Sequence, residues 1–308
     1  MDIVLYSRPQ SSYTAEDVAA LFDALDRSGM GWRVNRDFAS LAESLAGRSF
    51  APAGLYDDAS QIDDRAQVMV SYGGDGTFLD CVRMLGGRPV PIIGINSGRL
   101  GFLANVSKRH LETAFRDLRE GNYSVVSRTL IRAEGDFGSS PEYPFAFNEL
   151  AIQRQSPNMI STTVFVNDEM IATYWGDGVL VSTPAGSTAY SLSVGGPVVA
   201  PDCRCFLISP IAPHNLTMRP VVIPDTAVIR ICVATRGTDF SVSLDNQTYS
   251  AADGASFRIV KADKSIFLVR LQNISTAGNR VGVGANRTNL PTIGYFTVIM
   301  LYLHFNRT

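Results

Sequence analysis

A glycine-rich turn with one carboxylate, Gly-Gly-Asp-Gly-Thr at residues 73–77, lies where an apolar run ends and a helix-like run begins. Glycines let a backbone approach a phosphate closely, and the first turn of a helix offers free N–H groups to an anion. Asp75 is itself an anion in that position. This makes sense if Asp75 holds a magnesium ion or takes a proton from an attacking hydroxyl. The alternative is a tight turn in which Asp75 only caps the helix.

Two further glycine-bearing segments follow this turn. Residues 94–102 (GINSGRLGF) come after the next apolar run, where sheet-based folds usually bind ligands. Residues 175–197 (WGDGVLVSTPAGSTAYSLSVGGP) carry hydroxyls and amides suited to ribose and phosphate oxygens. Within them, Asp177 is suited to a sugar diol or an amide, and Tyr190 to stacking on a base. Taken alone, the third segment is more often a serine-rich crossover between strands.

The first hundred residues alternate strand-like and helix-like runs around these segments. Thr14 and Asp17 form a helix-start box, and Gly29 is placed to end that helix. The other predicted helices are Thr77–Leu85 and Ser107–Glu120. The predicted strands are Ile3–Tyr6, Val68–Tyr72 and Val90–Ile95. This alternation predicts a parallel sheet covered by helices.

The second half changes to short β-rich runs separated by turn residues. The predicted strands are Thr162–Val166, Val179–Ser182, Val228–Ala234, Phe240–Leu244 and Phe267–Leu271. Asn167-Asp168 and Asp245-Asn246 are predicted hairpin turns, because Asn and Asp tolerate positive φ. The sequence therefore predicts a Rossmann-like α/β domain at residues 1–124 and an antiparallel, β-sandwich-like domain at 125–275. An atypical tail at 276–308, without Asp or Glu, follows.

The amino-acid composition limits the kinds of partner that this protein is expected to bind. The 308 residues are 45% hydrophobic with a formal net charge of -2, which is typical of a soluble globular protein and argues against a broad nucleic-acid-binding face. Four cysteines, of which only Cys203 and Cys205 are close together, make a poor zinc signature. The start has no signal-peptide pattern, and the longest apolar run, Tyr295 to Phe305, is too short for a membrane helix. We expect a cytoplasmic protein with no membrane or nucleic-acid partner.

The three segments occur in an order that resembles the NAD kinase family. GGDGT is followed by Asn148-Glu149 and then by D-G-x-x-x-S-T-P-x-G-S-T-A-Y-S-L-S-x-G-G-P at residues 177–197. The proline- and histidine-containing stretch at 209–220 also resembles the family, so the match covers about Val68 to Leu271. GGDGT alone is shared with lipid kinases and, loosely, with phosphofructokinases. The long third motif is far more specific.

The resemblance implies a Rossmann-like domain followed by a β domain, and transfer of a phosphoryl group from ATP or polyphosphate to the 2′-hydroxyl of the adenosine ribose of NAD. The reaction would need Mg²⁺ or another divalent cation, and the metal ligands stay unassigned. Asp75 would be the catalytic carboxylate. The protein would be a homo-oligomer, either a dimer or a tetramer. The dinucleotide would be contacted by Asp75, Gly76, Asn148, Glu149, Asp177, Ala185, Thr188, Ala189, Tyr190, Ser191, Leu192, Ser193, Ala212 and Gln247.

Some positions depart from the family pattern, and two other functions stay open. Asp245-Asn246-Gln247 stands where the family commonly has D-G-Q, and Ala185 replaces a frequent threonine. The tail does not resemble the usual closing helix. A lipid kinase would explain the first segment but not the third. An NAD(P)-binding regulator without turnover would explain the pocket residues, although the presence of Asp75 argues against it.

Overall fold

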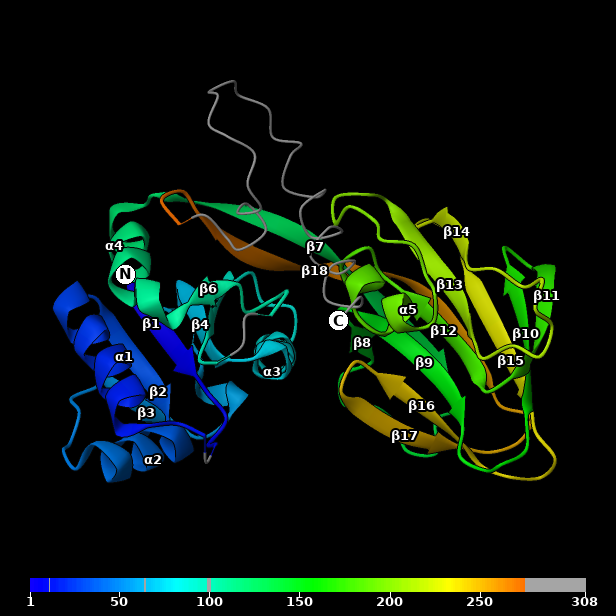
Figure 1. Cartoon of the computed structure of the whole chain (residues 1–308), viewed down its shortest axis with the longest axis horizontal. Coiled ribbons are helices and arrows are strands. Elements are labelled where there is room, and N and C mark those ends of the chain that lie inside the picture. Colours follow the sequence, from blue (N-terminus) through cyan, green and yellow to red (C-terminus); the bar gives the residue numbers. More distant parts are fainter. Residues whose placement is uncertain (11, 64, 99–100, 275–308) are drawn as a thin grey trace, which may run out of the picture. The chain divides into compact units, whose positions relative to one another are not determined.

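The computed structural model describes residues 1–274 except positions 11, 64 and 99–100. The described residues form two compact units: Met1–Val126 together with residues 267–274, and Ser127–Ile266 (Figure 1). The sequence-based division assigned residues up to 275 to the second domain. The chain instead returns to the first unit, because Leu271 and Ile274 are buried in that unit's hydrophobic core. The predicted tail at 276–308 lies outside the described residues.

The first unit is built on a parallel sheet whose central order is β3-β2-β1-β4-β5. These strands are β1 (Asp2–Tyr6), β2 (Gly31–Asn35), β3 (Gly54–Tyr56), β4 (Val68–Gly73) and β5 (Ile92–Asn96). Both β6 (Val106–Ser107) and the end of β18 (Ser256–Leu271) pair with β5. The order reverses between β1 and β4. Open α/β sheets bind ligands at the carboxyl ends of the strands where the order reverses.

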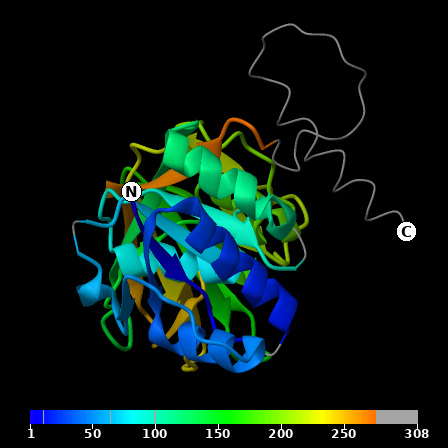
Figure 2. The same ribbon diagram turned by 90° about the vertical axis from the view of Figure 1, so that its left-hand side faces the viewer.

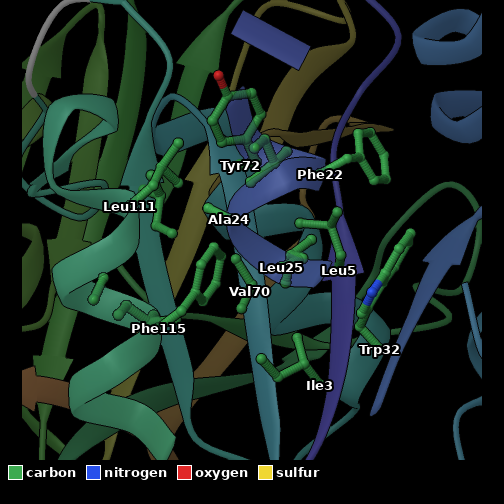
Figure 3. Packing of buried hydrophobic residues seen from close by; sticks show 14 of the residues in the cluster. Ile3, Leu5, Phe22, Ala24, Leu25, Trp32, Val70, Tyr72, Leu111 and Phe115 are labelled. Carbon is green, nitrogen blue, oxygen red and sulfur yellow. The ribbon is translucent and has the colours of Figure 1, made fainter. Parts of the chain in front are cut away.

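Helices cover both faces of this sheet. They are α1 (Ala15–Ser28), α2 (Arg36–Ala46), α3 (Asp75–Leu85) and α4 (Leu111–Glu120), with short 3-10 turns η1 (Ala59–Gln61) and η2 (Lys108–His110). Figure 2 views this unit with α1 (dark blue) and α4 (green) toward the reader. In Figure 3, Phe22 of α1 and Phe115 of α4 lie with Leu5 and Val70 of the sheet in one buried cluster. Helix α3 packs against β4 and β5.

Local signals explain where two of these helices begin. Thr14 accepts a hydrogen bond from the Asp17 N–H (3.2 Å), and Gly29 ends α1 at a φ of 68°, which confirms the predicted helix. Helix α3 begins at Asp75, two residues before its predicted start, because Gly74 takes the capping position. The predicted helix at Ser107–Glu120 begins as the 3-10 turn η2 and becomes α-helical at Leu111.

The second unit is a sandwich of two mostly antiparallel sheets, as predicted. One sheet has the order β14-β13-β12-β9-β16-β17, and in the other β11, β10, β15 and the first part of β18 are neighbours. Phe206 and Phe240 of the first sheet and Phe257 of the second share one core. The remaining elements are β7 (Tyr123–Gly135), β8 (Phe145–Ala146), β9 (Glu149–Arg154), β10 (Ile160–Val166), β11 (Glu169–Gly176), β12 (Gly178–Ser182), η3 (Ala185–Thr188), α5 (Tyr190–Ser193), β13 (Cys205–Ile211), β14 (Val221–Pro224), β15 (Ile229–Ala234), β16 (Phe240–Leu244) and β17 (Gln247–Ala251).

Both predicted hairpin turns are present in the second unit. Asn167 and Asp168 have φ values of 50° and 67°, and Asp245 has a φ of 51°. The first turn joins β10 to β11 and the second joins β16 to β17. Within the described part of the chain, no helix has the length and apolarity needed to span a bilayer.

Candidate functional site

The glycine-rich turn lies at the reversal point of the first unit's sheet. Strand β4 ends at Gly73, Gly74 precedes the helix, and Asp75 is the first residue of α3. Gly73 has a φ of 155°, and a Cβ atom there would collide with the Thr77 side chain, so this position requires glycine. The first N–H groups of a helix have no intrahelical acceptor, which leaves the first turn of α3 available to an anion.

The Asp75 carboxylate holds the second glycine-bearing segment. Its Oδ1 accepts hydrogen bonds from the backbone N–H groups of Leu103 (3.0 Å) and Ala104 (2.9 Å), and its Oδ2 accepts one from Phe102 (3.0 Å). A Cβ atom on Gly101 would collide with the carboxylate. The first two predicted segments therefore form one structure, in which Asp75 orders residues 101–104.

Among the described residues, Asp75 keeps one acceptor position for a ligand. An ionised carboxylate has about four lone-pair positions, and the loop's N–H groups occupy three of them. Asp75 can therefore accept one hydroxyl or one metal ion without releasing the loop. Asp75 is only partly exposed, so its surroundings limit the directions from which a ligand can approach.

Three backbone N–H groups fix the Asn148-Glu149 segment in the second unit. Those of Phe147 (2.7 Å), Asn148 (2.7 Å) and Glu149 (3.2 Å) donate to the Asp245 carboxylate. On the other side, the Asn148 carbonyl accepts the Thr183 N–H at 2.9 Å. Asp245, which the sequence placed only in a hairpin turn, is thus the residue that positions this segment.

The third glycine-bearing segment packs on Asn148. A Cβ atom on Gly186 would collide with the Asn148 carbonyl oxygen and would lie within 2.7 Å of its backbone carbons. The Thr183 hydroxyl donates to the Phe147 carbonyl (2.7 Å) and accepts the Gly186 N–H (3.1 Å). Two motifs that are far apart in the sequence therefore meet through backbone contacts.

Two carboxyl groups of this cluster have altered acidity. Burial and, to a smaller extent, the nearby charge of Asp245 raise the pKa of Glu149 to about 8, against the opposing effect of the Tyr190 N–H. Burial also raises the pKa of Asp245 to about 6, although its three backbone hydrogen bonds lower it. Glu149 Oε2 is buried and has no hydrogen-bond partner among the described residues. Glu149 therefore holds its proton to a higher pH than an exposed glutamate does, and its Oε2 is a buried acceptor without a partner among the described residues.

The raised pKa of Glu149 predicts a pH-dependent stability. Between about pH 4.5 and 8 the unfolded chain releases this proton while the folded chain keeps it, so the free energy of unfolding falls as the pH rises. Glu149→Gln cannot ionise. We expect the free energy of unfolding of this variant, relative to that of the wild type, to increase by about 1–2 kcal/mol from pH 6.5 to pH 8.5. The increase is kept to this size because water entry relaxes part of the burial penalty.

Urea unfolding at both pH values measures this difference. The pH range lies above the Asp245 pKa of about 6, so Asp245 contributes little to the change. Glu142→Gln, at an exposed position of the same unit, is the control. Equal pH dependence in Glu149→Gln and the wild type would show that Glu149 ionises normally.

Asp177 and Tyr190 have side-chain partners of their own. Asp177 Oδ1 accepts a hydrogen bond from Arg154 Nε at 2.6 Å, and the Arg154 N–H donates to the Asp177 carbonyl at 2.9 Å. Gln153 Nε2 donates to the Tyr190 hydroxyl at 2.6 Å. Arg154 and Gln153, neighbours in β9, were missed from the sequence because no motif contains them. They fix the orientation of two side chains that the sequence had identified.

The remaining predicted residues are spread over short elements of the second unit. Ala185 and Thr188 lie in η3, Ala189 follows it, and Tyr190, Ser191, Leu192 and Ser193 form α5. Ala212 follows β13 at a φ of 41°, and Gln247 is the first residue of β17. Ser191 is fully buried, and its hydroxyl has no partner among the described residues. Asp75 and Gly76 belong to the first unit.

Oxygen ligands for a divalent cation are sparse. The described residues contain no group of three or more His, Cys, Asp or Glu side chains arranged to hold a metal ion. Mg²⁺ is often bound by one or two carboxylates together with substrate phosphates and water. The single open acceptor position of Asp75 fits that mode of binding.

Comparison with known proteins agrees with this fold. Residues 29–123 match the ATP-NAD kinase N-terminal domain, and residues 147–271 match the ATP-NAD kinase C-terminal domain. An NAD kinase from Bacteroides fragilis is 36% identical over 89% of this chain and 93% of its own length. One from Porphyromonas gingivalis is 35% identical over 89% and 94%. The fold and the matched domains define a kinase that acts on a dinucleotide.

The chain belongs to the NAD kinase family, and it is an enzyme that phosphorylates NAD. Among solved structures, yeast NADH kinase complexed with NADH has the same fold, with a TM-score of 0.76 and 24% identity over 88% of this chain and 84% of its own. An NAD kinase from Archaeoglobus fulgidus in complex with ATP gives a TM-score of 0.69 and 25% identity, over 88% and 94% of the two chains.

Proposed function

We propose that this enzyme transfers the γ-phosphoryl group of ATP to the 2′-hydroxyl of the adenosine ribose of NAD, giving NADP and ADP. The observation that carries the proposal is the free acceptor position on Asp75, next to the open first turn of α3. The similarity to the Archaeoglobus fulgidus enzyme, which was solved with ATP, supports ATP as the donor. Inorganic polyphosphate is a second donor to test.

Asp75 accepts the proton of the 2′-hydroxyl in this mechanism. The 2′-oxygen forms a bond to the γ-phosphorus, and the bond from that phosphorus to the β–γ bridging oxygen breaks, so that ADP leaves. The N–H groups of Gly76 and Thr77, in the first turn of α3, donate to phosphate oxygens. A Mg²⁺ ion bound through the substrate phosphates and water would neutralise charge on the transferred group, while the open position of Asp75 serves the hydroxyl.

The second-unit cluster binds the dinucleotide in this proposal. Glu149 and Asn148 bind ribose hydroxyls and adenine, Tyr190 stacks on a base, and Asp177 binds the nicotinamide end. The other contacts come from Ala185, Thr188, Ala189, Ser191, Leu192, Ser193, Ala212 and Gln247. Support comes from the buried, unpartnered Oε2 of Glu149 and the side-chain contacts that orient Asp177 and Tyr190. A cytoplasmic homo-oligomer, dimer or tetramer, is part of the same proposal.

The direct test is NADP formation by the purified protein. NAD, ATP and Mg²⁺ are supplied, and NADP is followed with an NADP-specific dehydrogenase; parallel reactions contain polyphosphate in place of ATP or EDTA in place of free Mg²⁺. We expect turnover with ATP that EDTA abolishes. Phosphorylation at a hydroxyl other than the 2′ position, identified by NMR of the product, would refute the proposed chemistry. Absence of turnover with either donor would refute the proposed donors.

A further inference from the structure

Arg8 lies at the same edge of the first unit's sheet as the glycine-rich turn. It is the second residue after β1, and β1 and β4 are the adjacent parallel strands between which the strand order reverses. Ser7 fixes the start of this loop. Its N–H donates to Asn35 Oδ1 (3.2 Å) and its hydroxyl pairs with the Tyr13 hydroxyl (2.8 Å), so Arg8 begins from a defined backbone position.

Asp80 of α3 fixes the orientation of the Arg8 guanidinium. Nη2 donates to Asp80 Oδ1 at 2.8 Å, and Nε donates to Oδ2, which also accepts a hydrogen bond from the Tyr6 hydroxyl at 3.4 Å. The Asp80 side chain is only 6% exposed, whereas that of Arg8 is 42% exposed. The ion pair is thus anchored on the buried Asp80, and its arginine reaches the surface.

The third nitrogen of the guanidinium remains available. Nη1 takes no part in the pair with Asp80, and it lies 3.3 Å from the position that a Cβ atom would take on Gly76. The absence of a side chain at Gly76 therefore leaves room for the guanidinium beside the first turn of α3. If the ion pair only tied the loop to α3, Nε and Nη2 would be enough for that purpose. The position of Nη1 beside Gly76 would then have no role.

We propose that Arg8 binds a phosphate group of the phosphoryl donor, and that Asp80 is a positioning residue that fixes the guanidinium. The N–H groups of Nη1 and the free backbone N–H groups of Gly76 and Thr77 together suit an anion with several oxygens. Gly76 follows Asp75 directly, so a phosphate held there belongs to the group that reacts with the hydroxyl. This inference rests on the proposed function for the identity of the ligand.

Steady-state kinetics with varied ATP and varied NAD tests the inference. We expect Arg8→Ala to raise the KM for ATP about 10- to 100-fold and to leave the KM for NAD within about 2-fold, since a hydrogen bond to a charged group is lost on the donor side only. Arg8→Lys is expected to recover part of the loss, and added methylguanidine to rescue Arg8→Ala but not the wild type.

Arg36→Ala is the matched control. Arg36 also lies just after a strand, and it donates to both oxygens of Asp57 through Nε (2.6 Å) and Nη2 (3.3 Å), as Arg8 does with Asp80. It begins α2 after β2, which is separated in the sheet from β4 and its glycine-rich turn by β1. Its loss should leave both KM values unchanged.

Calorimetric titration with inorganic tripolyphosphate separates this inference from the proposed function, because it needs no turnover. Binding that weakens about 10-fold or more in Arg8→Ala supports the phosphate site even if the wild type makes no NADP. Three results would overturn it: an unchanged KM for ATP, an increase confined to the KM for NAD, or a lower melting temperature with equal changes in both KM values. The second result would assign the phosphate to the dinucleotide.

Discussion

Asp75→Asn is expected to make NADP with a kcat about 10²- to 10⁴-fold lower than the wild type, because an amide cannot accept the hydroxyl proton. The KM for NAD should change much less. The substitution also has a second effect. One end of the asparagine amide is an N–H donor, and it must face at least one of the loop N–H groups that now donate to the carboxylate. We therefore expect faster hydrogen exchange at residues 102–104.

Gly101→Ala separates the two effects. Its Cβ atom displaces the carboxylate without removing it, so a lower kcat in this variant measures the requirement for correct placement. Gly98→Ala, where a Cβ atom meets no described atom within 4 Å, is its control. Asp37→Asn, an exposed carboxylate in the first turn of α2, controls for helix-end charge. An Asp75→Asn enzyme within about 10-fold of wild-type kcat would show that Asp75 does not accept the proton.

Gly186→Ala is expected to lower the free energy of unfolding by about 3 kcal/mol or more, and to weaken NAD binding. The added methyl group collides with the Asn148 backbone, which cannot move aside as the end of a flexible side chain can. Asn148 is also fixed by Thr183 on one side and Asp245 on the other. Chemical denaturation and NAD titration measure the two effects.

Gly195→Asn is the control for the third segment. Gly195 has a φ of 83°, with open space around the position of a Cβ atom, and asparagine tolerates positive φ better than most residues. It should cost less than about 1 kcal/mol. Equal stability of Gly186→Ala and the wild type would mean that η3 can shift away from Asn148 without loss.

Short-range signals made part of the fold predictable from the sequence. Helix α1 has a threonine cap, a glycine end and an apolar face within one short stretch, and all of them act locally. Helix α2 begins after Asn35, whose side chain makes no capping hydrogen bond, so this helix lacked the start signal that identified α1. The return of Phe267–Leu271 to the first unit could not be predicted, because a strand pattern does not specify its partner.

The candidate site divides in the same way between local and long-range features. Asp75 and Glu149 lie in motifs that can be recognised directly in the sequence. Their supports come from distant positions: Asp245 is about a hundred residues from the segment it holds, and the Asp80 partner of Arg8 lies 72 residues further along the chain. Hydrogen bonds of this kind depend on the folded backbone. Sequence analysis therefore identified the candidate carboxylates and missed the residues that orient them.

Strand β18 has a consequence for synthesis of the chain on the ribosome. The second unit, Ser127–Ile266, is one continuous segment and is complete before the last residues of β18, which belong to the first unit, have emerged. The first unit is assembled from the start of the chain and from residues made after the second unit, including Val269 and Leu271 of its core. Strand β5 of the first unit therefore lacks its β18 partner while more than a hundred residues are translated. The domain made first is completed last.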